Sequence, residues 1–166
     1  MKRDLFVLLG LLLSFALISL AADKEFKIPY EKYTLSNGMD VILHIDHSNP
    51  IAAVYIVYHV GSAREEKGRT GFAHLFEHLR FNESQNVPQG QWFKRLQGAG
   101  ATNVNGSTSN DRTNYYEVIP KNALEMALWM ESDRMGFLLS KFSAQTFTTQ
   151  QGVVQNEKRR SDNSPY

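Results

Sequence analysis

The sequence predicts an α+β fold, a mixed β-sheet with helices packed on it, and three observations support this fold class. Residues 51–60 are apolar at both alternating positions, which indicates a central strand covered on both faces. Residues 122–139 carry apolar side chains at helical spacing, which is typical of an amphipathic helix. Residues 22–166 suffice for one domain and contain no repeat and no low-complexity segment.

The first elements expected after a polar entry are the two strands of a hairpin. Residues 33–35 and 39–44 are predicted to form these strands. Asn37-Gly38 lies between them and suits the positive φ angles of a type I′ turn. After the central strand, Thr70 is predicted to cap the next helix, because a threonine hydroxyl can accept a hydrogen bond from a free N–H group of the first turn.

Two further helices are expected in the second half of the chain. Trp92 and Leu96 have helical spacing, and the small residues 98–100 end that helix. A long amphipathic helix follows over 122–139. Its buried stripe is predicted to consist of Leu124, Ala127, Leu128 and Met135.

The same half of the chain is expected to supply two strands. Residues 101–109 are polar and extended, with little apolar side chain to bury, which favours the edge of the sheet. Residues 115–119 predict another strand, which Pro120 stops. Asp111 and Arg112 are predicted to stabilise the turn between these two strands.

The start of the chain predicts a secretory signal peptide over residues 1–21. A charged beginning precedes an apolar run over 5–20, which is shorter than the about 20 residues that span a bilayer. Small residues at Ser19 and Ala21 predict cleavage after Ala21, so that residues 22–166 form the mature domain. We therefore expect a secreted or periplasmic protein. The alternative is an uncleaved leader that anchors the chain in the membrane.

Charge and cysteine content exclude several classes. The formal charge of +1 becomes 0 without the leader, which removes two cations and one anion, so no basic excess indicates nucleic acid or an anionic membrane as a partner. The leader is the only feature that predicts membrane contact. The chain has no cysteine, which excludes disulfides, a lipoprotein anchor and a thiolate metal ligand.

The stretch His74-Leu75-Phe76-Glu77-His78 is an H-x-x-E-H motif, the inverted form of the zinc-protease motif H-E-x-x-H. Histidines four residues apart on a helix lie about 40° apart around its axis and about 6 Å apart along it, so both can reach one ion. Glu77 shares their side of the helix, where its carboxylate can accept a proton as a general base. The alternative is a helix that buries these groups as hydrogen-bonding partners without a metal.

A site with two histidines needs a third protein ligand, because a catalytic zinc ion has three and keeps its fourth position open. The candidates are a carboxylate or one of His44, His47 and His59. Glu157 is the best of them, since it lies one helical turn after Val153 on an apolar stripe. The alternative for Glu157 is a solvated glutamate before a basic run.

Nearly all of the chain after the leader resembles the N-terminal domain of the M16 metallopeptidases, the family of pitrilysin, insulysin and mitochondrial processing peptidase. Secreted bacterial two-domain members are the most similar. The stretches that carry the resemblance are Leu35-Ser36-Asn37-Gly38, Tyr58-His59-Val60-Gly61-Ser62, residues 71–78, Asn103-Val104-Asn105-Gly106-Ser107-Thr108, Asp111-Arg112-Thr113-Asn114-Tyr115-Tyr116-Glu117, Glu131-Ser132-Asp133-Arg134-Met135, and residues 153–160 and 162–166.

The resemblance implies roles for the motif residues. In this family two histidines and a glutamate about eighty residues downstream bind one zinc ion, which here implies His74, His78 and Glu157. The glutamate between the histidines is the general base, which implies Glu77. The family also binds substrate along a sheet edge, which makes Asn103, Asn105 and Ser107 candidate substrate contacts. An ordinary solvated edge strand is the alternative for these three.

Three positions depart from the family pattern. Many relatives carry a second glutamate where this chain has Gln150, whose amide can still orient neighbours through hydrogen bonds. Relatives usually have an apolar residue at the position of Arg80 and often a small one at Glu83. Arg80 either faces solvent or adds positive charge near the site.

These observations predict a zinc-dependent metalloendopeptidase that hydrolyses peptides or unfolded polypeptides and binds one Zn²⁺ per chain. The resemblance implies that family members continue beyond the equivalent of Tyr166, so we expect an incomplete domain, a fragment completed by a second M16 domain or a partner subunit. The alternative is a non-catalytic peptide-binding or assembly module, in which Glu77 would have no use. S-ribosylhomocysteinase-type enzymes also use H-x-x-E-H but need a cysteine.

Overall fold

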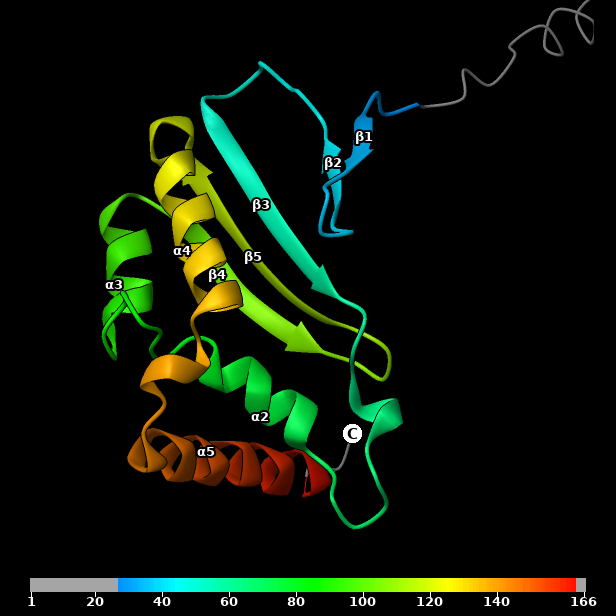
Figure 1. Cartoon of the computed structure of the whole chain (residues 1–166), viewed down its shortest axis with the longest axis vertical. Helices are drawn as coiled ribbons and strands as arrows, with labels where there is room; N and C mark the ends of the chain where they lie inside the picture. Colours follow the sequence, from blue (N-terminus) through cyan, green and yellow to red (C-terminus); the bar gives the residue numbers. More distant parts are fainter. Residues whose placement is uncertain (1–26, 164–166) are drawn as a thin grey trace, which may run out of the picture. The chain divides into compact units, whose positions relative to one another are not determined.

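The computed structural model describes residues 27–163, which fall into two compact units divided between His47 and Ser48. In the first unit, β1 (Glu31–Thr34) pairs antiparallel with β2 (Asp40–Leu43). Figure 1 shows this hairpin in blue. The prediction of a hairpin over this segment is confirmed.

The turn of this hairpin differs from the predicted type I′. The N–H of Gly38 donates to the carbonyl of Leu35 at 2.9 Å, and the N–H of Met39 donates to Oδ1 of Asn37 at 3.1 Å. Gly38 has a φ of +86°, whereas Asn37 has a negative φ. A type I′ turn needs positive φ at both positions, so the structure has a type I-like turn completed by a left-handed glycine.

The second unit contains an antiparallel sheet of three strands, β3 (Ile51–Tyr58), β5 (Thr113–Pro120) and β4 (Thr102–Thr108), in the spatial order β3-β5-β4. Strand β5 is therefore the central one. The prediction that residues 51–60 form a central strand covered on both faces is wrong for the described residues, where β3 lies at an edge with Tyr55 55% exposed. The apolar side chains on both faces of β3 predicted that both faces are buried, whereas only one face is covered.

Strand β4 occupies the opposite edge, as predicted. Its pairing with β5 shifts between Thr102 and Asn105, where Asn103 has a φ of +52°. This irregularity is a β-bulge, a feature common at sheet edges. The turn after β4 is held as expected, because Asp111 accepts a hydrogen bond from Ser109 Oγ at 3.0 Å and the Arg112 guanidinium donates to side chains of the hairpin.

Over residues 48–163, four α-helices accompany the sheet: α2 (Phe72–Leu79), α3 (Gln91–Gly98), α4 (Leu124–Gly136) and α5 (Ala144–Asp162). In Figure 1, α3 and α4 cover one face of the sheet, and α2 and α5 run side by side at its end. The main core lies between the sheet and α3 and α4. It consists of Val54, Val87, Trp92, Leu96, Ala101, Ile119, Ala127 and Met130.

The buried face of α4 is more polar than predicted. Leu128 is 50% exposed and Met135 37% exposed, so these two members of the predicted stripe are wrong, although Ala127 is buried. Arg134 and Glu131 are buried in their place and form an ion pair, with Arg134 Nε 2.8 Å from Glu131 Oε2. Because these charges satisfy each other, the helix can bury a face that hydrophobicity alone does not indicate.

Within residues 27–163, no helix is long and apolar enough to cross a membrane. The predicted signal peptide, residues 1–21, lies outside the described residues.

Candidate metal centre

The helix that carries the H-x-x-E-H motif begins at a carboxylate cap. The N–H of Gly71 donates to Oε2 of Glu65, and the N–H of Ala73 donates to Oε1, each at 2.7 Å. Glu65 lies after the 3₁₀ turn η1 (Ser62–Arg64), six residues before Gly71. The prediction that Thr70 caps this helix is wrong. The carboxylate of Glu65 takes this role instead, because an anion is favoured at the positive end of a helix.

An apolar contact between α2 and α5 positions the motif. Leu75 and Leu79 are buried against Val154 of α5, together with Phe142 and Phe147. Since Leu75 and Leu79 are the neighbours of the two histidines along the helix, this packing turns the histidines towards α5. The same contact brings residue 157, one turn after Val154, opposite them.

The three side chains predicted as zinc ligands therefore converge. Nε2 of His74 lies 3.1 Å from Nε2 of His78, and Oε2 of Glu157 lies 3.3 Å from the first and 3.4 Å from the second. Ligand atoms on a tetrahedral zinc ion lie about 3.3 Å apart, because each is about 2.0–2.1 Å from the metal. Among the described residues, these three form the group with metal-ligand geometry.

The donor set fits zinc in its chemistry as well. Two imidazoles and one carboxylate are the ligands of known catalytic zinc sites, which leave one position open. The side chains of His74 and Glu157 are 39% and 45% exposed, so the site is open to solvent. His44 belongs to the other unit, where its Nδ1 lies 2.6 Å from the carbonyl of Pro29.

The start of α5 is fixed by two caps. Ser143 accepts the N–H of Thr146 at 3.0 Å, and Glu83 accepts the hydroxyl of Thr146 at 2.9 Å and the N–H of Ser143 at 3.3 Å. A carboxylate is favoured at this positive helix end. This contact gives Glu83, one of the departures from the family pattern, a structural role.

Gln150 links α5 to the end of α2. Its Nε2 donates to Oδ1 of Asn82 at 3.2 Å, and Asn82 Nδ2 donates to the carbonyl of His78 at 2.8 Å. Gln150 thus supports the histidine helix through Asn82. This contact agrees with the orienting role predicted for the amide of Gln150.

Glu77 is not one of the three converging side chains and is buried, with 7% exposure. Its Oε2 accepts a hydrogen bond from the hydroxyl of Thr108 at 2.6 Å. Thr108 is the last residue of β4 and lies next to Thr113, whose hydroxyl donates to the carbonyl of Val60 at 3.0 Å. Sequence reasoning missed Thr108, because no local pattern signals a contact between a strand end and a helix 31 residues away.

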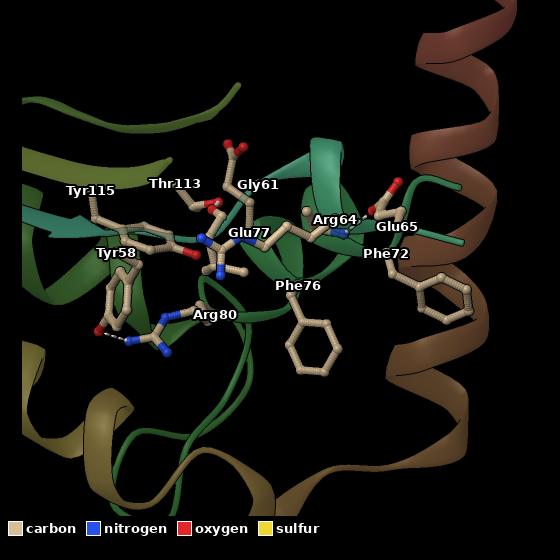
Figure 2. A pocket seen from close by; sticks show the side chains of 12 residues that line it. Tyr58, Gly61, Arg64, Glu65, Phe72, Phe76, Glu77, Arg80, Thr113 and Tyr115 are labelled. Atoms are coloured by element: carbon tan, nitrogen blue, oxygen red, sulfur yellow. Dashed lines mark hydrogen bonds between the residues drawn. The ribbon is translucent and has the colours of Figure 1, made fainter. Parts of the chain in front are cut away.

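A pocket of about 310 Å³ adjoins Glu77 (Figure 2). Arg80 forms part of its wall and does not simply face solvent: its guanidinium lies 4.3 Å from the ring centre of Tyr58 and 5.2 Å from that of Tyr115, and it donates to the Tyr58 hydroxyl. Burial lowers the pKa of Arg80 and raises the pKa values of the Tyr58 and Tyr115 phenols. The positive charge of Arg80 opposes this rise, because it lowers the pKa of both phenols.

The predicted substrate contacts lie along β4, and the structure gives two of them local partners. Asn105 accepts the N–H of Gly106 at 2.9 Å, and Ser107 donates to Oδ1 of Asn114 at 2.6 Å. Asn103 is exposed in the bulge. A role of these residues in substrate binding stays a prediction.

This chain is similar to known zinc proteases. Residues 40–165 match the insulinase family, peptidase family M16. "Zinc protease PqqE" of Helicobacter pylori is 34% identical over 163 residues, which cover 95% of this chain and 36% of that protein. "Probable zinc protease PqqL" of Haemophilus influenzae is 32% identical over 76% of this chain and 14% of its own length.

Solved structures agree with these matches. A protease from Helicobacter pylori superimposes with a TM-score of 0.79 at 32% identity, over 84% of this chain and 33% of that one. Pitrilysin superimposes with a TM-score of 0.62 at 28% identity, over 70% of this chain and 12% of the pitrilysin chain. The chain thus spans about a third of the length of PqqE and has the predicted α+β fold. With its family match over residues 40–165, the chain belongs to peptidase family M16.

Proposed function

We propose that this chain supplies the catalytic zinc centre of a metalloendopeptidase, with His74, His78 and Glu157 as ligands of one zinc ion and Glu77 as general base. The observation that carries the proposal is the convergence of the three ligand atoms at 3.1–3.4 Å. The helix that supplies both histidines also carries the buried carboxylate of Glu77, which is not one of the three. The names of the relatives, zinc proteases, support the same reaction class.

In this mechanism a bound zinc ion supplies Lewis acidity at the scissile carbonyl and makes water a stronger acid. Glu77 accepts the proton of the attacking water and delivers it to the nitrogen of the leaving amine. The hydrogen bond from Thr108 occupies one carboxylate oxygen, Oε2, and so leaves Oε1 to take the proton. A glutamine at position 77 could not accept this proton.

The substrate in this proposal is an extended peptide that adds to the free edge of β4, as peptides add to exposed sheet edges elsewhere. Asn103, Asn105 and Ser107 are the proposed contacts on this strand. We further propose that residues 1–21 direct export to the periplasm. We also propose that a second M16 domain or a partner subunit closes the cleft, since the matched segments are 36% of PqqE and 14% of PqqL.

Metal analysis tests the site. We expect about one zinc ion in the purified chain, loss of zinc in His74→Ala and His78→Ala, and retained zinc in Glu77→Gln, because a base need not be a ligand. His59→Ala is the matched control, a histidine outside the site that should leave the zinc content unchanged. Equal zinc in the wild type and both ligand variants would show that the site is assigned wrongly.

A further inference from the structure

The pocket beside Glu77 has two arginines in its wall. Arg64 enters from the 3₁₀ turn η1, and Arg80 follows the last turn of α2. The volume of about 310 Å³ is at the lower end of the range of small-molecule sites, about 300–1,000 Å³. The pocket is therefore large enough for a side chain or the end of a peptide.

Arg80 lacks an acidic partner. Among the described residues it forms no ion pair, its one hydrogen bond goes to the neutral hydroxyl of Tyr58, and its buried Nε has no hydrogen-bond partner. A guanidinium group that is removed from water without a counter-ion is costly. The two tyrosine rings offset part of this cost through cation–π contacts, but they leave the N–H of Nε without an acceptor.

The two acids in the pocket wall are already engaged. Both oxygens of Glu65 accept N–H groups at the start of α2, and Glu77 accepts the hydroxyl of Thr108. No ion pair joins either of them to Arg64 or Arg80 in the described part of the chain. An anion that enters from outside would therefore find two arginines available.

The rest of the wall is apolar. In Figure 2, Phe72 and Phe76 lie at the end of the pocket opposite Tyr58, and both phenylalanine side chains are 48% exposed. Val60 contributes a further apolar surface. A ligand that fits this pocket combines a carboxylate with an apolar body, because the arginines match the first and the phenylalanines the second.

We propose that this pocket is a carboxylate-binding subsite for peptides, in which Arg80 and Arg64 hold a carboxylate and Phe72 and Phe76 contact its apolar neighbour. The carboxylate has two sources, the C-terminus of a peptide or an acidic side chain. As a substrate subsite the pocket rests on the proposed peptidase function, and it narrows the substrate class to peptides that present a carboxylate next to Glu77.

Four small probes test the proposal on the zinc-free chain, where a carboxylate cannot bind the metal itself. N-acetylphenylalanine presents a C-terminal carboxylate, and N-acetylglutamic acid α-amide presents a side-chain carboxylate. N-acetylphenylalaninamide and N-acetylglutaminamide are their neutral counterparts. Titrations followed by protein NMR should show at least one acid binding about tenfold tighter than its amide, because charge-assisted hydrogen bonds are the stronger ones. The acid that binds identifies the source.

The variant Arg80→Met should abolish the difference between acid and amide. This variant should keep the wild-type fold, because the substitution replaces an unpaired buried charge by an apolar side chain. Its circular dichroism spectrum should therefore match that of the wild type. Arg80→Lys should bind the acid more weakly than the wild type, because lysine lacks the planar fork of arginine. Arg69→Met is the control. It also removes one positive charge, but Arg69 is exposed and lies outside the pocket wall.

Equal binding of acids and amides, an unchanged preference in Arg80→Met, or no binding of any probe would overturn the subsite. These results are distinguishable from failure of the proposed function. A chain that binds zinc through His74 and His78 but does not prefer the acids loses only the subsite. A chain that prefers the acids through Arg80 but binds no zinc keeps a carboxylate site and loses the peptidase centre.

Discussion

The hydroxyl of Thr108 donates a 2.6 Å hydrogen bond to the carboxylate of Glu77, which joins the last residue of β4 to the helix of the metal centre. The same strand is the sheet edge along which we propose that peptides bind. The hydrogen bond therefore sets the position of the proposed general base relative to the strand that would align the substrate. A buried carboxylate needs such a partner, because it has few other polar neighbours.

Thr108→Val is expected to lower the free energy of unfolding by about 1–3 kcal/mol, because it leaves a buried carboxylate oxygen without its donor. Valine has nearly the shape of threonine, so the loss reports on the hydroxyl. Urea unfolding of the zinc-free chain measures it. Thr108→Ser keeps the hydroxyl and should be clearly more stable than the valine variant. If the two variants are equally stable, the hydrogen bond contributes nothing to the free energy of unfolding. The zinc content should be unchanged in both variants.

Glu65→Gln is expected to lower the free energy of unfolding by about 1 kcal/mol, since the helix start loses a charged acceptor of two N–H groups. Zinc affinity should fall as well, because the first turn of α2 holds His74. Urea unfolding and zinc titration measure the two effects. Glu66→Gln removes the same charge one residue along, at an exposed position, and should change neither.

The third prediction concerns the buried carboxylates between β5 and α4. Burial, and after it the charge of Glu131, raises the pKa of Glu117 to about 8 from its ordinary value of 4.5, while Arg134 acts in the opposite direction. The folded chain therefore holds a proton that the unfolded chain releases. The free energy of unfolding must then fall as the pH rises from about 4.5 to about 8, and Glu117 adds no slope outside this window.

Glu117→Gln should remove this slope, because glutamine does not titrate. The difference in the free energy of unfolding between variant and wild type should change by on the order of 3 kcal/mol between these two pH values, in favour of the variant at the alkaline end. Urea unfolding at a series of pH values measures the difference, which cancels the titration of the histidines. Glu125→Gln, at an exposed position on α4, should run parallel to the wild type.

The sequence could predict the residues of the candidate metal centre because their positions follow from local periodicity. A spacing of four places His74 and His78 on one side of a helix, and Leu75 and Leu79 beside them supply the face that packs on α5. Glu157 is predicted from its place one turn after Val153, which is 37% exposed, whereas the valine buried in this contact is Val154. Apolar pattern and polar motif point in the same direction here, so the fold brings the three side chains together.

The features that the sequence could not predict depend on contacts between distant segments. Glu65 rather than Thr70 caps α2 because a loop folds back over the helix end. Arg80 stacks on tyrosines from two strands, although an arginine near the end of a helix is more often solvated. The edge position of β3 is a further case, because an apolar strand has the same pattern whether one face or both are covered.

Export should remove residues 1–21, because a charged start and a short apolar run are the features that signal peptidase substrates share. N-terminal sequencing of periplasmic material from cells that express the chain measures this. The expected first residue is Ala22. A chain that keeps Met1 and fractionates with membranes would show that the leader is an anchor, and a chain that keeps Met1 in the cytoplasm would show that it is not a leader.

The last prediction is that residues 22–166 alone, loaded with zinc, cleave peptides at a negligible rate. The ligand side chains His74 and Glu157 are 39% and 45% exposed, so water surrounds the site and little of a substrate would be enclosed. Holding a peptide in the reactive orientation supplies several kcal/mol of the barrier reduction, about 7–11 kcal/mol in favourable cases, and a site open on one side supplies little of it. An assay with an unstructured fluorogenic peptide measures the rate, with Glu77→Gln as the background. Cleavage that depends on both zinc and Glu77 would show that the described residues suffice, and that the open site orients its substrate through the edge of β4 or through a second copy of the chain.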